Sequence, residues 1–189
     1  MLLFSGGRNE SVEALTYDHL EKTLFWTDGL KQSIRRILLD REDLHVNENN
    51  TIEVVHLLEG DKPRGLVSDP CTRYEFTKLF FQFSKNNRHV FIFRMLFWTN
   101  WNIDRPTIER SHLNGSHREV IVQKGLFMPH GLGLDVNQQM IYWANNLRHG
   151  TFQIERSRFD GSRRQLMYEG KGHEMRGQFI FGLTVKKLI

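Results

Sequence analysis

The amino-acid sequence predicts an all-β fold built from repeated four-stranded units, and three observations support this prediction. Aromatic residues make up 12% of the 189 residues, and such side chains favour the pleated, half-buried surface of a strand. A segment centred on tryptophan recurs three times in the same sequence context. Asn-Gly and Asp-Gly pairs, which favour tight hairpins, follow two of these three segments.

Each copy of the repeat begins with a strand that ends in Asp, followed by a strand that ends in Asp or Asn. In chain order these strand pairs are 13–18 with 23–28, 64–69 with 95–100, and 130–135 with 140–145. A chance recurrence of one Trp motif would not repeat its neighbours in the same order. The three ordered copies therefore indicate a repeat architecture.

Two further strands complete each copy. An Ile-x-Arg strand comes next (34–36, 108–110 and 154–156), and a short closing strand ends the unit (53–57, 119–122 and 165–168). Turn residues separate these strands most clearly at Leu113–Ser116 and Phe159–Ser162, where Gly and Asn tolerate positive φ. Four short strands in a unit of roughly 40–50 residues are typical of a propeller blade.

The tryptophan segments resemble the YWTD motif of low-density lipoprotein (LDL) receptor class B repeats. The motif positions are Phe25, Trp26, Thr27, Asp28, Phe97, Trp98, Thr99, Asn100, Tyr142, Trp143, Ala144 and Asn145. The resemblance implies a partial YWTD-type β-propeller with about three of the family's six four-stranded blades. We expect a first blade over 1–62, a second over 63–128, a third over 129–180 and the start of a fourth over 181–189.

Alternation along the motif strand predicts how a blade is packed. Phe25 and Thr27 should face one side of the sheet, and Trp26 and Asp28 the other. The resemblance implies that the aromatic side chains fill the space between blades, and that the Asp ties its strand end to the backbone of an adjacent blade. Two copies have Asn in place of this Asp. Asn can still form the hydrogen bond, but without the additional strength that the charge of a carboxylate gives. A sugar- or peptide-binding surface is the alternative role for the Trp side chains.

The second copy contains an insertion. Asp18 and Trp26 are eight positions apart, as are Asp135 and Trp143, whereas Asp69 and Trp98 are twenty-nine apart. The surplus of twenty-one residues equals the length of the stretch 74–94. Removing that stretch restores a normal repeat.

We interpret this stretch as a translated intron. The codon for Arg73 can contain a splice donor, and the codon for Arg94 a splice acceptor. Both sites would divide an arginine codon after its second base, so splicing would restore one arginine in frame. The alternative is a genuine hairpin, with strands at Leu79–Phe83 and Val90–Phe93 around a Lys-Asn-Asn turn.

Composition and motifs exclude several classes of function. The net charge of +4 comes mostly from the stretch 74–94, so no nucleic-acid surface is predicted. The single cysteine, Cys71, excludes an internal disulfide and a cysteine-based zinc site, and it is either a small buried residue or a reactive or bridging thiol. The nine histidines have no metal-ligand spacing, and no nucleophile elbow or phosphate loop is present. We therefore expect no enzyme activity, metal or cofactor.

Membrane and leader segments are also missing from the sequence. No stretch of about 18 apolar residues occurs, and residues 1–8 lack the apolar region of a signal peptide. We expect the leader and the membrane anchor to lie outside this sequence. A propeller hydrolase with metal-binding carboxylates around its channel and an intracellular scaffold propeller are the rival classes.

The resemblance implies a module that binds an extracellular protein of unknown identity. The candidate binding residues follow the motif strand, where loops of a rigid scaffold gather: Trp101, Asn102, Arg105, Asn146, Arg148 and His149. Ordinary solvated turn residues are the alternative. Asn9, Asn49 and Asn114 lie in N-glycosylation sequons, which fit an extracellular setting.

A narrower likeness concerns residues 23–29, 98–102 and 106–111, which are similar to an insect member of the family. It implies a single-pass membrane protein on the cell surface, with EGF-like modules outside this chain and a role in spermatogenesis and oogenesis. An endocytic or Wnt co-receptor ectodomain of the same family is the alternative. Three blades cannot close a ring, so we expect exposed blade faces and poor solubility of the chain alone.

Overall fold

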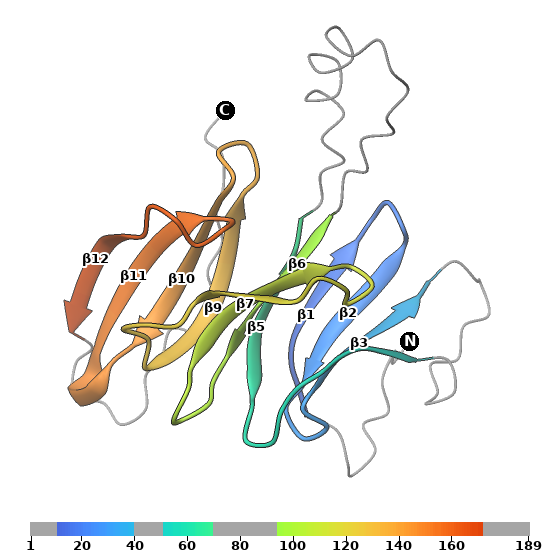
Figure 1. Ribbon diagram of the computed structural model, residues 1–189, viewed down its shortest axis with the longest axis horizontal. Coiled ribbons are helices and arrows are strands. Elements are labelled where there is room, and N and C mark those ends of the chain that lie inside the picture. Colours follow the sequence, from blue (N-terminus) through green and yellow to red (C-terminus); the bar gives the residue numbers. More distant parts are fainter. Residues whose placement is uncertain (1–10, 40–50, 70–93, 172–189) are drawn as a thin grey trace, which may run out of the picture.

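The computed structural model describes residues 11–39, 51–69 and 94–171, which fold into three four-stranded antiparallel sheets (Figure 1). We call these sheets blades 1, 2 and 3. Blade 1 contains β1 (Val12–Asp18), β2 (Thr23–Asp28), β3 (Ser33–Leu38) and β4 (Ile52–His56). Blade 2 contains β5 (Pro63–Ser68), β6 (Met95–Asn100), β7 (Thr107–His112) and β8 (Glu119–Val122). Blade 3 contains β9 (Met128–Asp135), β10 (Met140–Asn146), β11 (Thr151–Arg158) and β12 (Gln165–Lys171), with a 3-10 turn at Arg148–Gly150.

The strands of each blade pair in chain order, as a meander. The predicted all-β, partial-propeller fold is therefore confirmed. The exact blade boundaries remain predictions, and the expected start of a fourth blade, Cys71 and most of the insertion lie outside the described residues. Within the described part of the chain, no helix has the length and apolar character needed to cross a membrane.

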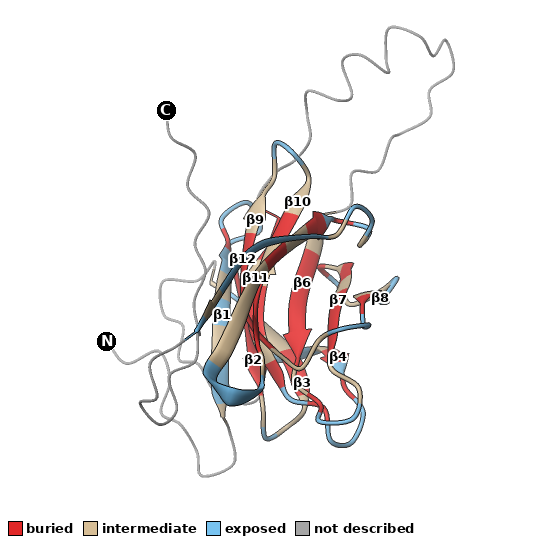
Figure 2. Ribbon diagram, turned by 90° about the vertical axis from the view of Figure 1, so that its left-hand side faces the viewer, coloured by how far each residue is buried: buried red, intermediate tan, exposed pale blue. Residues whose placement is uncertain are grey.

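The motif strand lies in the middle of each blade and is its most buried element (Figure 2). In β2 all six residues are buried. Alternate side chains of this strand enter different cores, as expected from the period of two. Trp98 packs toward blade 1, whereas the neighbouring Phe97 packs toward blade 3.

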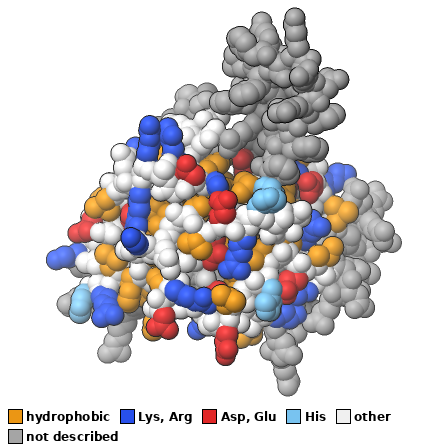
Figure 3. Space-filling view, viewed as in Figure 1, with side chains coloured by type: hydrophobic (Ala, Val, Ile, Leu, Met, Phe, Trp, Pro, Cys, Tyr) orange, Lys and Arg blue, Asp and Glu red, His pale blue; other side chains and the backbone are white. Residues whose placement is uncertain are grey.

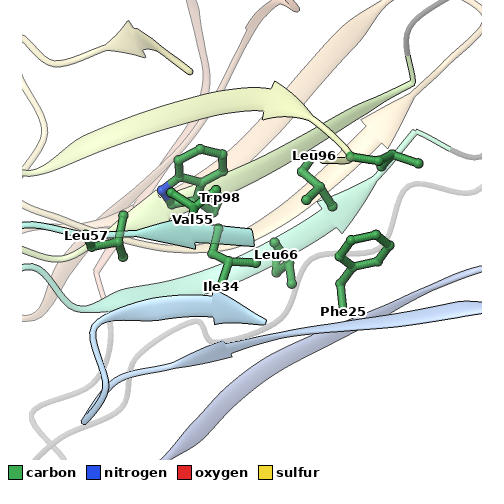
Figure 4. Close-up of a cluster of buried hydrophobic side chains, with 8 residues drawn as sticks. Phe25, Ile34, Val55, Leu57, Leu66, Leu96 and Trp98 are labelled. Atoms are coloured by element: carbon green, nitrogen blue, oxygen red, sulfur yellow. The ribbon is translucent and has the colours of Figure 1, made fainter. Parts of the chain in front are cut away.

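Among the described residues, two hydrophobic clusters lie between blades, and a third, made of Leu24, Trp26 and Ile37, comes from blade 1 alone. In the core between blades 1 and 2, Phe25 and Ile34 come from blade 1, and Leu66, Leu96 and Trp98 come from blade 2 (Figure 4). All five are at most 5% exposed. The second core, between blades 2 and 3, repeats the arrangement with the equivalent side chains. Each blade is therefore held by its neighbours.

The Asn-Gly and Asp-Gly turns contribute to the same contacts between neighbouring blades, which we call seams. Gly115 has φ +83, and a Cβ atom on it would lie 2.0 Å from the carbonyl oxygen of Val54 in blade 1. Gly161 has φ +80, and its Cβ would lie 2.0 Å from the carbonyl oxygen of Ile121 in blade 2. Glycine is required at both positions by conformation and by close approach to the preceding blade.

The insertion begins where a hairpin is already closed. The N–H of Asp69 donates to the carbonyl of Met95 at 2.9 Å, so the two ends of the connection are adjacent. In blades 1 and 3 the corresponding connections, 19–22 and 136–139, contain four residues. Arg94, the last residue of the predicted insertion, is described, and its guanidinium contacts both carboxylate oxygens of Asp18 at 2.5 Å.

Arg94 also pairs with Glu21, so its side chain joins the second blade to the first hairpin. Asp18 is fully buried and additionally accepts hydrogen bonds from the N–H groups of Leu20 and Glu21. An arginine immediately before β6 is therefore part of the blade contact, whatever precedes it.

We predict that deleting residues 74–94 leaves the fold intact. The remaining four residues, 70–73, would match the connections of the other blades, and Arg73 would take the position of Arg94. The far-ultraviolet circular dichroism spectrum should keep its β character, and the melting temperature should not fall.

A matched variant tests the role of the arginine. Adding Arg73→Ala to the deletion should lower the free energy of unfolding by about 1–3 kcal/mol, because the carboxylate of Asp18 would be buried without its cation. Loss of the folded spectrum in the deletion variant itself would show that the stretch is an integral part of the blade.

Candidate functional site

The connections that follow the motif strands lie at one end of the three packed blades, together with the connections between blades. We call it the loop end, and it consists of residues 29–32, 57–62, 101–106, 123–127 and 147–150. The β2–β3, β4–β5, β6–β7 and β10–β11 connections lie together at the lower edge of Figure 1. The described end of the insertion, Arg94, lies at the opposite end of β6. All six predicted binding residues lie at the loop end or at its border.

The loop after β6 is fixed by a buried carboxylate. Asp61, which is 2% exposed, accepts hydrogen bonds from Nδ2 of Asn102 at 2.9 Å and from Arg105 at 3.1 Å. Oδ1 of Asn102 accepts from the backbone N–H groups of Asp104 and Arg105. These bonds leave Ile103 at the tip of the loop, where it is 87% exposed.

Trp101 is held between side chains of two neighbouring strands. The guanidinium of Arg64 lies 4.8 Å from the centre of its ring, and the ring of His130 lies 5.5 Å away. Its backbone N–H donates to the carbonyl of Lys62 at 2.8 Å. Arg64 is in turn paired with Glu13 of blade 1. One aromatic ring is therefore positioned by residues from all three blades.

His130 is the titratable group most affected by this arrangement. It is 3% exposed. Burial, together with the positive charge of Arg64, lowers the pKa of His130 to about 4, although Glu13 acts in the opposite direction. The imidazole is therefore neutral at physiological pH and adds no positive charge next to the guanidinium of Arg64.

Blade 3 contributes a smaller and more exposed part of the site. Arg148 and His149 are exposed, and the Arg148 guanidinium lies 5.2 Å from the ring centre of Phe127. His149 adopts φ 60 within the 3-10 turn. Asn102 and Asn146 are buried, so the solvent-facing members of the predicted set are Trp101, Arg105, Arg148 and His149.

The motif threonine joins neighbouring blades. Oγ1 of Thr99 accepts from the N–H of Gly65 at 2.7 Å and donates to the carbonyl of His130 in blade 3 at 2.9 Å. Thr27 makes the equivalent bond to the carbonyl of Arg64 in blade 2. Ala144 replaces the threonine in blade 3 and has no hydroxyl for such a bond.

The motif Asp and Asn residues secure the segment that enters their own blade. Oδ1 of Asn100 accepts from Lys62 at 3.0 Å, and Oδ1 of Asn145 accepts from Phe127 at 2.9 Å. Asp28 accepts from Ser11 in the same way. The hydrogen bond that we expected to join adjacent blades is therefore made to the connection that arrives from the preceding blade. It is not made to a strand of an adjacent sheet.

Two ion pairs, each between a buried glutamate and a more exposed arginine, were not predicted from the sequence. Glu109, 2% exposed, pairs with Arg118 at 2.7 Å, and Glu155 pairs with Arg164 at 2.6 Å. Arg118 also donates to the carbonyl of His56 in blade 1 at 3.2 Å, so the pair spans a seam. The sequence contained a signal for these pairs, because the Glu and Arg residues are nine positions apart in both blades.

The remaining predictions concern metals and sugars. Among residues 11–39, 51–69 and 94–171, no group of three or more His, Cys, Asp or Glu side chains is placed to hold a metal. Asn114 is exposed, and its Oδ1 accepts from both the N–H and the hydroxyl of Ser116. Asn9 and Asn49 lie outside the described residues, so glycosylation remains a prediction.

Comparison with known proteins gives a consistent family signal. Residues 94–136 match the low-density lipoprotein receptor repeat class B family. The chain is 34% identical over 166 residues to Protein cueball of Drosophila persimilis, covering 88% of this chain and 22% of the relative. The Drosophila grimshawi protein is 33% identical, with 86% and 23% covered. The chain thus spans about a fifth of the length of these curated relatives.

Solved structures show the same fold. A crystal structure of a nidogen/laminin complex contains a chain that is 26% identical, with a TM-score of 0.63, covering 93% of this chain and 52% of that chain. A TolB protein of Agrobacterium tumefaciens is 11% identical with a TM-score of 0.57, which is a likeness of fold alone.

We predict that His130 makes folding dependent on pH. Its pKa is about 4 in the folded chain and 6.5 in the unfolded one, so the unfolded chain binds more protons between these values. Stability should be fully present above pH 6.5 and should fall by up to about 3 kcal/mol as the pH drops toward 4. Urea unfolding across this range measures the effect.

Matched substitutions isolate this contribution. His130→Gln should flatten the pH dependence between pH 6.5 and 4, whereas His149→Gln, at an exposed position, should leave it unchanged. An identical slope in the wild-type chain and in His130→Gln would contradict the assignment.

Proposed function

Because the chain is part of a β-propeller of the low-density lipoprotein receptor class B repeat type, we propose that it is a non-enzymatic module that binds an extracellular protein through its loop end. The observation that carries the proposal is Ile103, which is 87% exposed on a loop fixed by Asp61. Leu30 (62% exposed) and Leu58 (56% exposed) lie at the same end. Exposed apolar side chains at the same end of the molecule as a held aromatic ring are typical of protein contact sites.

The rigidity of the loop end favours binding. Trp101 is half-buried and held by Arg64 and His130 before any partner arrives. An ordered side chain loses little conformational freedom on association, so more of its contact energy becomes affinity. Tryptophan is also among the residues most often found at the energetic centre of interfaces.

The surface chemistry points to a protein partner. Basic, acidic and hydrophobic side chains are interspersed along the lower edge in Figure 3, where the loop end lies. A surface of one sign of charge, as expected for nucleic acid, is not seen in this view. The nidogen relative was solved in a complex with laminin, which supports an extracellular matrix or cell-surface protein as the partner class.

The curated relatives support a cellular setting for the module. The likeness to Protein cueball supports a propeller on the extracellular side of a single-pass membrane receptor. We extend the proposal to a role in germ-cell development, in spermatogenesis and oogenesis.

The binding proposal predicts where substitutions act. Purified chain should be tested by biolayer interferometry against immobilised extracellular proteins, beginning with laminin. Trp101→Ala should weaken any specific binding about 30-fold or more, as expected for an interface residue worth about 2 kcal/mol. Ile103→Asp should have a comparable effect, because it introduces a charge into an apolar contact.

A substitution at the opposite end is the control. His117→Ala changes an exposed residue of the turn after β7 and should leave binding unchanged. Binding that is weakened by His117→Ala but not by the two loop-end substitutions would place the site elsewhere.

The germ-cell proposal has its own test. Disruption of the gene in the animal of origin should reduce the fertility of both sexes, and the wild-type gene should restore it. A rescue gene carrying Trp101→Ala should fail despite normal protein levels. Full fertility after disruption would contradict the proposal.

A further inference from the structure

The turn between β7 and β8 contains an asparagine whose side chain holds the turn through its oxygen. Asn114 is exposed, and its Oδ1 accepts hydrogen bonds from the backbone N–H of Ser116 at 3.0 Å and from the Ser116 hydroxyl at 2.7 Å. A backbone N–H can only donate, so the oxygen of the amide must face it. The amide nitrogen, Nδ2, is therefore directed away from the turn and makes neither of these bonds.

The equivalent turn of blade 3 shows that the fold does not need this nitrogen. Its first residue is Asp160, which is also exposed, and Oδ1 of Asp160 accepts from the N–H of Ser162 at 2.9 Å. The two turns share their backbone conformation, with φ +83 at Gly115 and φ +80 at Gly161. In both, the glycine N–H donates to the last residue of the preceding strand at 2.9 Å. An amide and a carboxylate thus support the same turn, and the amide nitrogen is the part that only blade 2 has.

This nitrogen lies in the acceptor sequence for N-linked glycosylation, Asn-Gly-Ser over residues 114–116. Glycosylation joins Nδ2 to C1 of the first sugar, so it uses the atom that the turn leaves unused. The Ser116 hydroxyl can keep its bond to Oδ1, and Nδ1 of His112 lies 3.0 Å from the same hydroxyl. The sugar would therefore be attached to a side chain that is held in one orientation.

The turn lies at the end of the three packed blades that is opposite to the loop end. Strand β7 begins directly after the loop-end connection 101–106 and ends at His112, so the turn that follows it is one strand length away. Close approach of Gly115 to the carbonyl of Val54 fixes the turn against the outer strand of blade 1. A glycan on Asn114 would therefore stand beside this seam and leave the loop end uncovered.

We propose that Asn114 carries an N-linked glycan, a bulky and hydrophilic group that covers this end of blade 2 while the loop end stays free for a partner. The oligosaccharide comes from a lipid diphosphate donor. The bond between C1 and the diphosphate breaks as the bond between Nδ2 and C1 forms, Nδ2 loses one proton, and the lipid diphosphate leaves. The inference rests on the proposed extracellular setting, because donor and transferase act in the lumen of the secretory pathway.

Secretion from cultured insect cells, with a leader fused before residue 1, tests the site independently of the natural setting of the chain. Mass spectrometry of proteolytic peptides should identify a glycan on Asn114. Asn114→Asp and Ser116→Ala should each lose one glycan from the intact mass. Asn114→Asp is the matched control for folding, because Asp160 shows that a carboxylate keeps the turn, and its circular dichroism spectrum should retain its β character.

The turn of blade 3 provides a test in the opposite direction. Asp160→Asn places the acceptor sequence Asn-Gly-Ser in an equivalent exposed turn, so this variant should gain one glycan. Adding Ser162→Ala to Asp160→Asn should remove that glycan again, because the acceptor sequence needs the hydroxyl.

Hydroxyl-radical footprinting tests which end the glycan covers, without requiring a partner. Compared with Asn114→Asp, the glycosylated chain should show less oxidation at His117, an exposed residue of the same turn. Oxidation of Trp101 and Ile103 at the loop end should be equal in the two proteins.

Three results would overturn the inference: an unmodified Asn114 in the secreted chain, no gain of a glycan in Asp160→Asn, or protection of Trp101 by the glycan. A glycan on the secreted chain together with an unmodified Asn114 in protein isolated from the animal would instead contradict the extracellular setting. The failure of the inference and the failure of the proposed function can therefore be told apart.

Discussion

The contact between neighbouring blades is the constraint on which the rest of the structure depends. A blade is a single twisted sheet with two apolar faces, and it cannot bury either face by itself. The motif strand contributes to both seams, because Trp98 packs against the preceding blade and Phe97 packs against the following blade. Hydroxyl bonds from Thr27 and Thr99, together with the glycine turns at Gly115 and Gly161, fix the distance between sheets.

Much of the fold could be predicted from the sequence because it is repetitive. Three copies of one pattern identify the four strands, their order and the two faces of the central strand. The ion pairs Glu109–Arg118 and Glu155–Arg164 were missed, because a buried glutamate and a surface glutamate look alike in one copy. Their shared spacing of nine residues would have revealed them if the copies had been compared position by position.

The candidate site could be predicted only in part, for a physical reason. Trp101 and Arg105 follow the motif strand, and their place at one end of the stack follows from the repeat. The partners that fix them, Asp61 and His130, lie in other segments, and their burial depends on how the blades stack. The side chain of Asn102 is directed inward for the same reason: its amide caps a loop rather than facing solvent.

The substitution of the motif threonine by Ala144 has a mechanical consequence. Thr27 and Thr99 attach the inner strand of one blade to the inner strand of the next, close to the axis of the stack. Blade 3 has no hydroxyl at this position, so a blade packed against its outer face would lack this bond. Under tension applied along the polypeptide, the two seams that carry a threonine bond should therefore resist separation more strongly than a seam formed on the outer face of blade 3.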